Sequence, residues 1–319
     1  MTVETVRGPV DPSALGRTYV HEHVFVLSPD VQQNYPAEWG SEDDRVADAV
    51  GRLRALAATG VSTIVDPTVI GLGRYLPRIV RVAEQVPELN VVVATGCYTY
   101  DSVPFFFHHR GPGVGMVEPM VGMFVDDIRT GITGTGVKAG MLKCAIDHQG
   151  LTPGVERVMR AVAQAHVETG TPITVHTHPG SQTGLEVHRV LPSEGVDPSR
   201  VVLGHSGDST DADHLSALAD LGYVLGMDRF GINLETTFEA RADIVVELAR
   251  RGYAGSMALS QDASCYIDWV DPDMLAFLPD WHYLHIGEKV LPYLLEHGVT
   301  QEQVDTMLVD VPRRVLAGA

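Results

Sequence analysis

The feature that most constrains the fold is an alternation, along the whole chain, of short β-branched apolar runs with longer amphipathic segments. Strands buried on both faces are near-continuous apolar runs, and helical crossovers cover the two faces of a parallel sheet. The apolar runs predict eight strands, over 18–26, 61–66, 90–96, 138–145, 172–176, 200–205, 222–227 and 256–262. The amphipathic segments predict helices over 43–59, 74–86, 118–131, 153–169, 184–194, 211–221, 239–251 and 284–296. These units fit a single (β/α)₈ barrel of the TIM type, with residues 1–319 as one domain and the active site at the C-terminal strand ends.

An open, doubly wound sheet is the rival architecture. Its phosphate-binding fingerprint is missing, because Gly71-Leu72-Gly73 is followed by Leu76 where a third glycine would stand. Neither a P-loop nor a Gly-x-Ser-x-Gly turn is present, which argues against nucleotide hydrolysis and the α/β-hydrolase mechanism. The barrel is therefore the predicted fold.

The charge and the cysteine content limit which binding partners and which cellular location we expect. The chain has 23 Lys and Arg against 41 Asp and Glu, a formal charge of −18, so we expect neither nucleic-acid nor anionic membrane binding. No run of apolar residues is long enough to span a bilayer, and no signal peptide is recognisable. The three cysteines, Cys97, Cys144 and Cys265, form no paired motif, which favours a reducing, cytoplasmic location.

Histidines gather at the predicted strand ends. Residues i and i+2 of a strand point to one face, so His21 and His23 could bind one ion. Three further strands end near His176, His205 and Asp262. Because the strand ends of a barrel meet at one mouth, these groups should converge, and five ligands are more than one catalytic zinc usually takes. The sequence therefore predicts two divalent ions.

Lys143 lies near the end of the fourth predicted strand, between Leu142 and Cys144. An ammonium group among metal ligands would be repelled by the cations and poorly solvated. Lys143 must therefore be neutral, as in Schiff-base enzymes, or converted to an anion that can bridge two metals.

Two connections are rich in large apolar side chains, 98–109 after the third strand and 263–283 after the eighth. Aromatic loops at barrel strand ends form either a substrate pocket or a subunit contact.

The ordered motifs resemble those of the phosphotriesterase family of the amidohydrolase superfamily. They are VHEHVF at 20–25, GMLKCA at 140–145, VHTH at 175–178, GHSGDS at 204–209 and LSQDASC at 259–265. Within the family, TGCYTYDSVPFFF from Thr95, GMDRFG from Gly226 and YIDW from Tyr266 resemble the phosphotriesterase-like lactonases, which hydrolyse N-acyl-homoserine lactones. The resemblance extends from about residue 7 to 315.

The resemblance implies a role for each matching residue. His21, His23 and Asp262 would hold the more buried metal, His176 and His205 the more exposed one, and Lys143, carboxylated by carbon dioxide, would bridge both. A hydroxide shared by the metals would attack the lactone carbonyl. Asp262 would pass a proton to the leaving alkoxide, with Asp208 as a relay. The metals are expected to be zinc, although these ligands also suit cobalt, manganese and iron.

Pocket residues follow from the same comparison. Tyr98 and Arg229 match residues that orient the lactone ring, and Trp269 would lie beside the acyl chain. The family also forms homodimers, and the loop after the third strand is a plausible contact.

Two positions depart from the family pattern. Gln261 stands where a histidine usually precedes the metal-binding aspartate, and Ser264 replaces a common cysteine. Glutamine cannot titrate, so a proton role at that position is in doubt. Outside the ligand set, His178 is expected to remain unligated and His166 to be a packing residue.

The sequence thus predicts a cytoplasmic lactonase with weak side activity on phosphotriesters. Three alternatives stay open: a dedicated organophosphate triesterase with the same ligands, Schiff-base chemistry on Lys143, and a metal-binding or sensor barrel without turnover.

Overall fold

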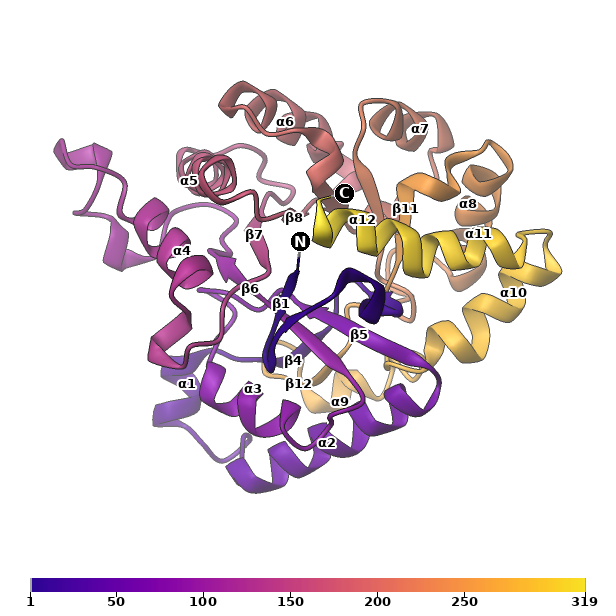
Figure 1. Ribbon diagram of the computed structural model, residues 1–319, viewed down its shortest axis with the longest axis horizontal. Helices are drawn as coiled ribbons and strands as arrows, with labels where there is room; N and C mark the ends of the chain where they lie inside the picture. Colours follow the sequence, from indigo (N-terminus) through magenta and orange to yellow (C-terminus); the bar gives the residue numbers. More distant parts are fainter. Residues whose placement is uncertain (1, 319) are drawn as a thin grey trace.

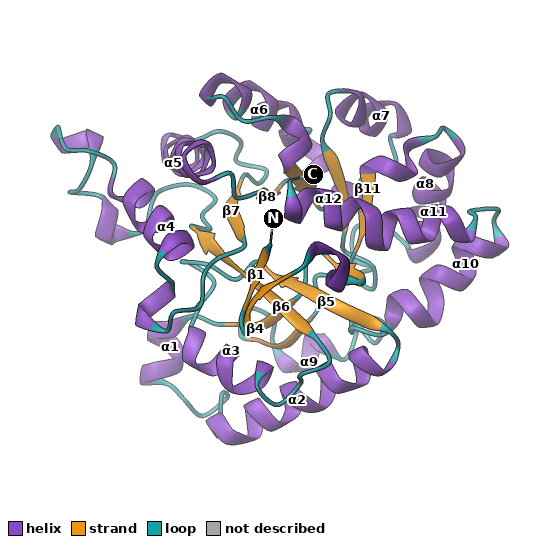
Figure 2. Ribbon diagram, in the orientation of Figure 1, coloured by secondary structure: helices purple, strands orange, loops and turns teal. Residues whose placement is uncertain are grey.

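A computed structural model describes residues 2–318 and shows a barrel of parallel strands inside a ring of helices (Figures 1 and 2). The strands follow one another in the order β3-β5-β6-β7-β8-β9-β10-β11, and every neighbouring pair is parallel. Their bounds are β3 Arg17–Tyr19, β5 Val61–Asp66, β6 Asn90–Gly96, β7 Met141–Ala145, β8 Ile173–His176, β9 Val201–Gly204, β10 Val224–Met227 and β11 Met257–Leu259. This confirms the predicted (β/α)₈ fold.

Two more strands extend the ends of this sheet. β4 (His23–Val26) continues from β3, β12 (Ser264–Ile267) follows β11, and the two pair in parallel. A short antiparallel hairpin, β1 (Val3–Thr5) with β2 (Gly8–Val10), precedes the barrel. Its start lies close to the end of the last helix in the middle of the view, so the two ends of the described chain are neighbours (Figure 1).

The first and last predicted strands differ most from the prediction, whereas β7, β8, β9 and β10 begin one to three residues later than predicted. The run 18–26 is two strands separated at residues 20–22, and 256–262 forms a strand only as far as Leu259. The run 263–283, predicted as a loop, contains β12 and a short helix. At both breaks the regular ladder is interrupted and the two segments bond to each other through isolated hydrogen bonds, for example from Asp262 N to His21 O at 3.1 Å.

Helices cover the outer face of the barrel, as the crossover pattern predicts (Figure 2). Those between or after the strands are α2 Glu42–Ala58, α3 Leu76–Ala83, α4 Pro119–Arg129, α5 Pro153–Thr169, α6 Thr183–Val190, α7 Ala212–Asp220, α8 Phe238–Arg250 and α10 Leu291–Glu296. Helices outside the prediction are α1 Pro29–Asn34, α9 Pro272–Leu275, α11 Gln301–Asp305 and α12 Val311–Ala317. The helix predicted from 284 begins instead with a π-helical turn, Ile286–Val290.

The connection between β6 and α4 projects from the body at the left of the view (Figure 1). Phe105 and Phe106 are exposed on it, whereas Phe107 is buried in the core. Within the described residues, no helix has the length and apolar character needed to cross a bilayer.

Candidate metal centre

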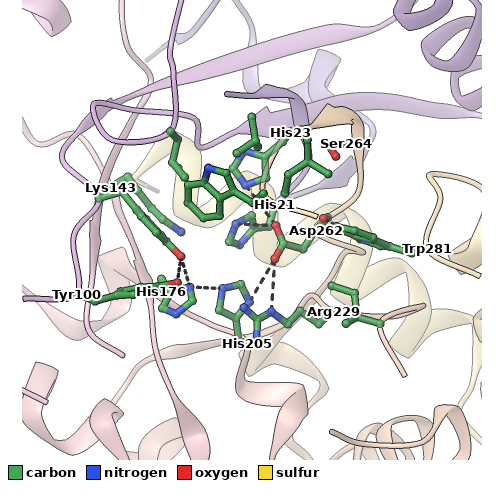
Figure 3. A pocket seen from close by; sticks show the side chains of 16 residues that line it. His21, His23, Tyr100, Lys143, His176, His205, Arg229, Asp262, Ser264 and Trp281 are labelled. Atoms are coloured by element: carbon green, nitrogen blue, oxygen red, sulfur yellow. Dashed lines mark hydrogen bonds and ion pairs between the residues drawn. The ribbon is translucent and has the colours of Figure 1, made fainter. Parts of the chain in front are cut away.

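Four imidazoles and one carboxylate meet at the C-terminal mouth of the barrel (Figure 3). His21 Nε2 and His23 Nε2 lie 3.4 and 3.2 Å from the same oxygen, Asp262 Oδ1. His176 Nδ1 and His205 Nε2 lie 2.8 Å from each other. The structure thus brings the residues predicted as metal ligands together as two adjoining sets.

In each of these four histidines, the ring nitrogen that faces away from the centre forms a hydrogen bond. His21 Nδ1 and His205 Nδ1 donate to the two oxygens of Asp228, at 3.0 and 2.9 Å. His176 Nε2 donates to Asp147 Oδ2 at 2.6 Å. With those nitrogens protonated, His21 Nε2, His205 Nε2 and His176 Nδ1 keep free lone pairs toward the centre.

His23 is oriented through a hydroxyl group. Thr68 Oγ1 donates to Asp66 Oδ1 at 2.5 Å, so this hydroxyl accepts from His23 Nδ1, 2.7 Å away. His23 Nε2 is therefore also left facing the centre. Such outer partners are the usual means by which proteins orient metal-binding imidazoles.

Two groups of three side chains in residues 2–318 place ligand atoms within 4.8 Å of one another: His21, His23 and Asp262, and His21, His205 and Asp228. The second group is explained by the hydrogen bonds that Asp228 accepts from two Nδ1 atoms. The first group directs two Nε2 atoms and a carboxylate oxygen to a common point. It is the donor set that fits a divalent ion.

Three of the four histidines favour the neutral form that metal binding requires. Burial lowers the pKa of His21 and of His205, and lowers that of His176 to about 4. Burial would also lower the pKa of His23, but hydrogen bonds and charges of Asp262 and Asp66 outweigh it and raise that pKa to about 9. A cation at the first set would oppose this protonation, because ligand nitrogens must be neutral to bind.

Lys143 points into the same cavity from β7 (Figure 3). It is only 1% exposed, and burial lowers the pKa of its ammonium group to about 8. No carboxylate of residues 2–318 forms an ion pair with it. A buried amine with a depressed pKa and no partner fits the expectation of a chemically modified or neutral lysine.

Arg229 lies across the mouth from Lys143. Its Nε is 3.5 Å from Asp262 Oδ2 and its Nη1 is 2.9 Å from Asp208 Oδ2. Burial opposes the charge, but the two carboxylates outweigh it and raise the pKa of the guanidinium. The other oxygen of Asp208 accepts from the buried Arg241 at 2.8 Å. Asp208 therefore fixes two arginines, and a proton relay through it would have to cross a guanidinium that does not deprotonate.

Tyr98 approaches the second histidine set. Its hydroxyl lies 3.1 Å from His176 Nδ1 and contacts the hydroxyl of Tyr100. Burial raises the pKa of Tyr98 well above its usual value, so this phenol keeps its proton and can donate it in a hydrogen bond.

The cavity between these groups has a volume of about 170 Å³. Trp269 is 45% exposed at its rim, with its ring centroid 5.7 Å from that of Tyr98. Ser264 lines the cavity as well. Apart from the ligands, its walls are largely apolar: Val26, Leu72, Ile232, Ile267, Trp269 and Trp281.

Gln261 does not face the cavity. Its fully buried amide donates to Tyr283 O at 2.9 Å, and its Oε1 accepts from Ile286 N at 2.9 Å. It serves as a structural bridge, so no proton role follows from this position. Two histidines outside the ligand sets have other partners: His178 bonds to Ser181 Oγ at 3.0 Å, and the buried His166 bonds to Thr171 O at 2.7 Å.

The sequence reasoning missed the carboxylates behind the ligands. Asp228 follows the end of β10 by one residue, and Asp147 follows the end of β7 by two. Extending the strand-end argument from histidines to all carboxylates would have found both. Glu22, Thr68 and Tyr100 carried no comparable signal.

Comparison with known proteins shows which family the chain resembles. The model of the phosphotriesterase family matches residues 1–316. A phosphotriesterase homology protein of Mycobacterium tuberculosis is 56% identical over 316 residues, covering 98% of this chain and 97% of that protein. An aryldialkylphosphatase of Saccharolobus solfataricus is 36% identical over 308 residues, covering 96% of each chain.

A solved structure of the phosphotriesterase from Mycobacterium tuberculosis superposes with a TM-score of 0.97 at 55% identity, covering 99% of this chain and 98% of that one. The similarity includes the whole barrel and is not confined to the motifs at its mouth. The chain therefore belongs to the phosphotriesterase family.

Proposed function

We propose that this phosphotriesterase-family hydrolase is a binuclear metal-dependent lactonase that opens N-acyl-homoserine lactones and thereby quenches quorum signals. The observation that carries the proposal is that Tyr98, beside His176, and Arg229, beside Asp262, line the same cavity as the two ligand sets. Both can donate hydrogen bonds to a ring ester, and the apolar walls suit an acyl tail. The sequence motifs around both residues resemble those of lactonases.

The residues present fit two divalent ions. His21, His23 and Asp262 would hold one, and His176 and His205 the other. Lys143, which lines the same cavity, would become a carbamate by adding carbon dioxide with loss of a proton, and would then offer anionic oxygens as further ligands. Bound ions, with zinc as our first expectation, would activate water and polarise the substrate carbonyl.

The protein groups then have separate tasks. Tyr98 donates its hydroxyl proton in a hydrogen bond to the substrate, and Arg229 positions the ring while Asp208 holds its guanidinium. The oxygen of water bonds to the lactone carbonyl carbon, and the ring C–O bond breaks. Asp262, whose carboxylate reaches the cavity, takes a proton from that water and passes it to the leaving alkoxide.

Substrate kinetics test the proposal against its nearest alternative. The aryldialkylphosphatase relative makes a dedicated phosphotriesterase the second candidate. The metal-loaded protein should show a higher kcat/KM for N-acyl-homoserine lactones of short and long acyl chain than for a paraoxon-like triester. The reverse order would identify a triesterase. Lactone binding without turnover would identify a sensor, and borohydride trapping of a carbonyl substrate on Lys143 would identify Schiff-base chemistry.

A conservative pair of variants tests the role of Tyr98. Tyr98→Phe removes the hydroxyl nearest His176 and should lower kcat on lactones by about 10²-fold, as loss of one preorganised donor does. Tyr100→Phe, which removes the neighbouring hydroxyl, is the matched control and should have a smaller effect. Metal content should be unchanged in both. Equal activity of Tyr98→Phe and the parent chain would contradict the assignment.

A cytoplasmic homodimer remains part of the proposal. All three cysteines are buried and unpaired, which is compatible with a reducing compartment. The projecting connection after β6 exposes Phe105, Phe106, Met116 and Val117, which could contact a second copy. Light scattering on the eluted protein would measure the mass directly.

A further inference from the structure

The barrel closes without a continuous ladder between its first and last strands. β3 and β11 are the two ends of the eight-stranded sheet, and only their extensions, β4 and β12, pair with each other. Residues 20–22, between β3 and β4, face residues 260–263, between β11 and β12. We call these two facing segments the seam. All three ligands of the first set lie in this seam or next to it.

Glu22 spans the seam with both carboxylate oxygens. Oε1 accepts the backbone N–H of Gln261 at 2.8 Å, and Oε2 accepts the backbone N–H of Ala263 at 2.9 Å. The residue between these two donors is Asp262. Its own N–H donates to His21 O at 3.1 Å. Three consecutive amides, at 261, 262 and 263, are thus tied to residues 21 and 22.

Asp262 needs such support because its backbone is strained. Its φ is +52°, in the left-handed region that costs non-glycine residues free energy. A conformation of this kind persists only where the surroundings impose it. The seam supplies the restraint on both sides of the residue.

We infer that Glu22 is a positioning residue that locks the Asp262 turn in its ligand geometry before any metal binds. Glu22 also stands between His21 and His23 in the chain, so it joins the segment that carries these two ligands to the amides on either side of Asp262. It is fully buried and does not line the cavity, and therefore acts through Asp262 and not on substrate. The inference rests on the proposed metal centre for its functional meaning.

Further contacts anchor Glu22 itself. Ser260 Oγ donates to Oε1 at 3.1 Å, and Gln261 Nε2 donates to the same oxygen at 3.3 Å. The Gln261 side chain also bonds to Tyr283 O and Ile286 N, and so connects Glu22 to the segment that leads into α10. Gln261, which departs from the family pattern, therefore belongs to the hydrogen-bond network around Glu22.

The first measurement uses the unchanged, metal-free chain. Hydrogen exchange should show the amides of Gln261 and Ala263 protected without metal, because Glu22 already holds them. Free exchange of these amides in the folded, metal-free protein would overturn the inference. This readout does not depend on the proposed activity, nor on metal binding.

The second measurement uses Glu22→Gln, which keeps the shape but has only one acceptor oxygen. One backbone N–H must then face an amide NH₂, and both amides at 261 and 263 should exchange faster. Calorimetric titration of the metal-free variant with zinc should show one site weakened about 10- to 100-fold and the other unchanged. With cobalt, the absorption bands of the weakened site should shift.

Thr63→Val is the matched control, because Thr63 is a fully buried strand residue whose hydroxyl donates to Leu15 O at 2.6 Å and forms no hydrogen bond with residues 20–22 or 260–263. It should lower the melting temperature without changing either zinc affinity. A Glu22→Gln variant that binds two zinc ions like the parent chain, or loses no more affinity than Thr63→Val, would overturn the inference. Absence of zinc binding in the parent chain would instead overturn the proposed metal centre.

Discussion

Asp228 shows how much one carboxylate can determine at the scale of a residue. It is fully buried, and its oxygens accept from His21, from His205 and from the backbone N–H of His205 at 2.7 Å. Room for it exists because Gly226 has no side chain: a Cβ there would lie 2.5 Å from Asp228 Oδ2. His205 is held with φ +67°, again in the left-handed region. One side chain therefore sets the tautomer of a histidine in each ligand set.

Replacing Asp228 should consequently weaken at least one of the two metal sites. Asp228→Asn keeps the shape but turns an NH₂ group toward one of the two Nδ1–H donors. We expect zinc affinity to fall about 10- to 100-fold at the affected site, measured by titration of the metal-free protein. Asp220→Asn, at an exposed carboxylate that accepts from Tyr253 at 2.9 Å, is the control. Unchanged affinity in Asp228→Asn would show that this hydrogen bond does not orient the ligands.

At the scale of an element, α5 is formed as its sequence predicts. Thr152 caps it, Pro153 occupies its first turn, and Gly170 ends it with φ +74°. Val155, Val158, Met159 and Val162 are all buried on the face that the helical spacing predicts. The spacing of its own residues therefore suffices to predict this helix, whereas its start has a second function. Thr152 Oγ1 donates to Asp101 O at 2.5 Å and so fastens the projecting connection.

Thr152→Ala should destabilise the fold through this helix start. Loss of the cap costs about 1 kcal/mol, in a range of roughly 0.5–2 kcal/mol, of the free energy of unfolding. Thr152→Ser keeps the oxygen that accepts from Val155 N and should behave like the parent chain. Denaturant titration of both variants measures the difference. Equal midpoints would mean that water replaces the cap at no cost.

At the scale of the whole molecule, His285 couples folding to pH. It is fully buried beside the π-helical turn, and neither ring nitrogen has a hydrogen-bond partner among residues 2–318. The nearest carboxylate oxygen, of Asp280, is 4.0 Å away. Burial lowers the pKa of His285 to about 4, against about 6.5 in an unfolded chain.

This shift makes acid destabilising over a defined window. Below about pH 6.5 His285 is protonated in the unfolded chain, whereas in the folded protein it stays neutral down to about pH 4. His285 therefore favours unfolding progressively as the pH falls through this range. The free energy of unfolding of the metal-free protein should therefore decline more steeply between these values than that of His285→Leu. A substitution at the exposed His109 is the control. Parallel curves for the parent chain and His285→Leu would contradict the prediction.

The fold could be predicted because its signal is local and repeated. β5 and β6 match their predicted bounds, and so does α5, since each depends on the spacing of its own apolar residues. The prediction was wrong at the seam, where the runs 18–26 and 256–262 are interrupted. No periodicity within either run encodes contacts with the other end of the chain.

The sequence by itself determined the barrel and the side chains that gather at its mouth, because strand order carries the strand ends to one place. Tertiary structure decided which nitrogen of each histidine faces the centre, and which groups hold the ligands in place. Those hydrogen bonds join residues far apart in the chain, as Glu22 and Ala263 are, at a separation of 241 positions. They exist only after the barrel has closed, since closure alone brings such groups within bonding distance.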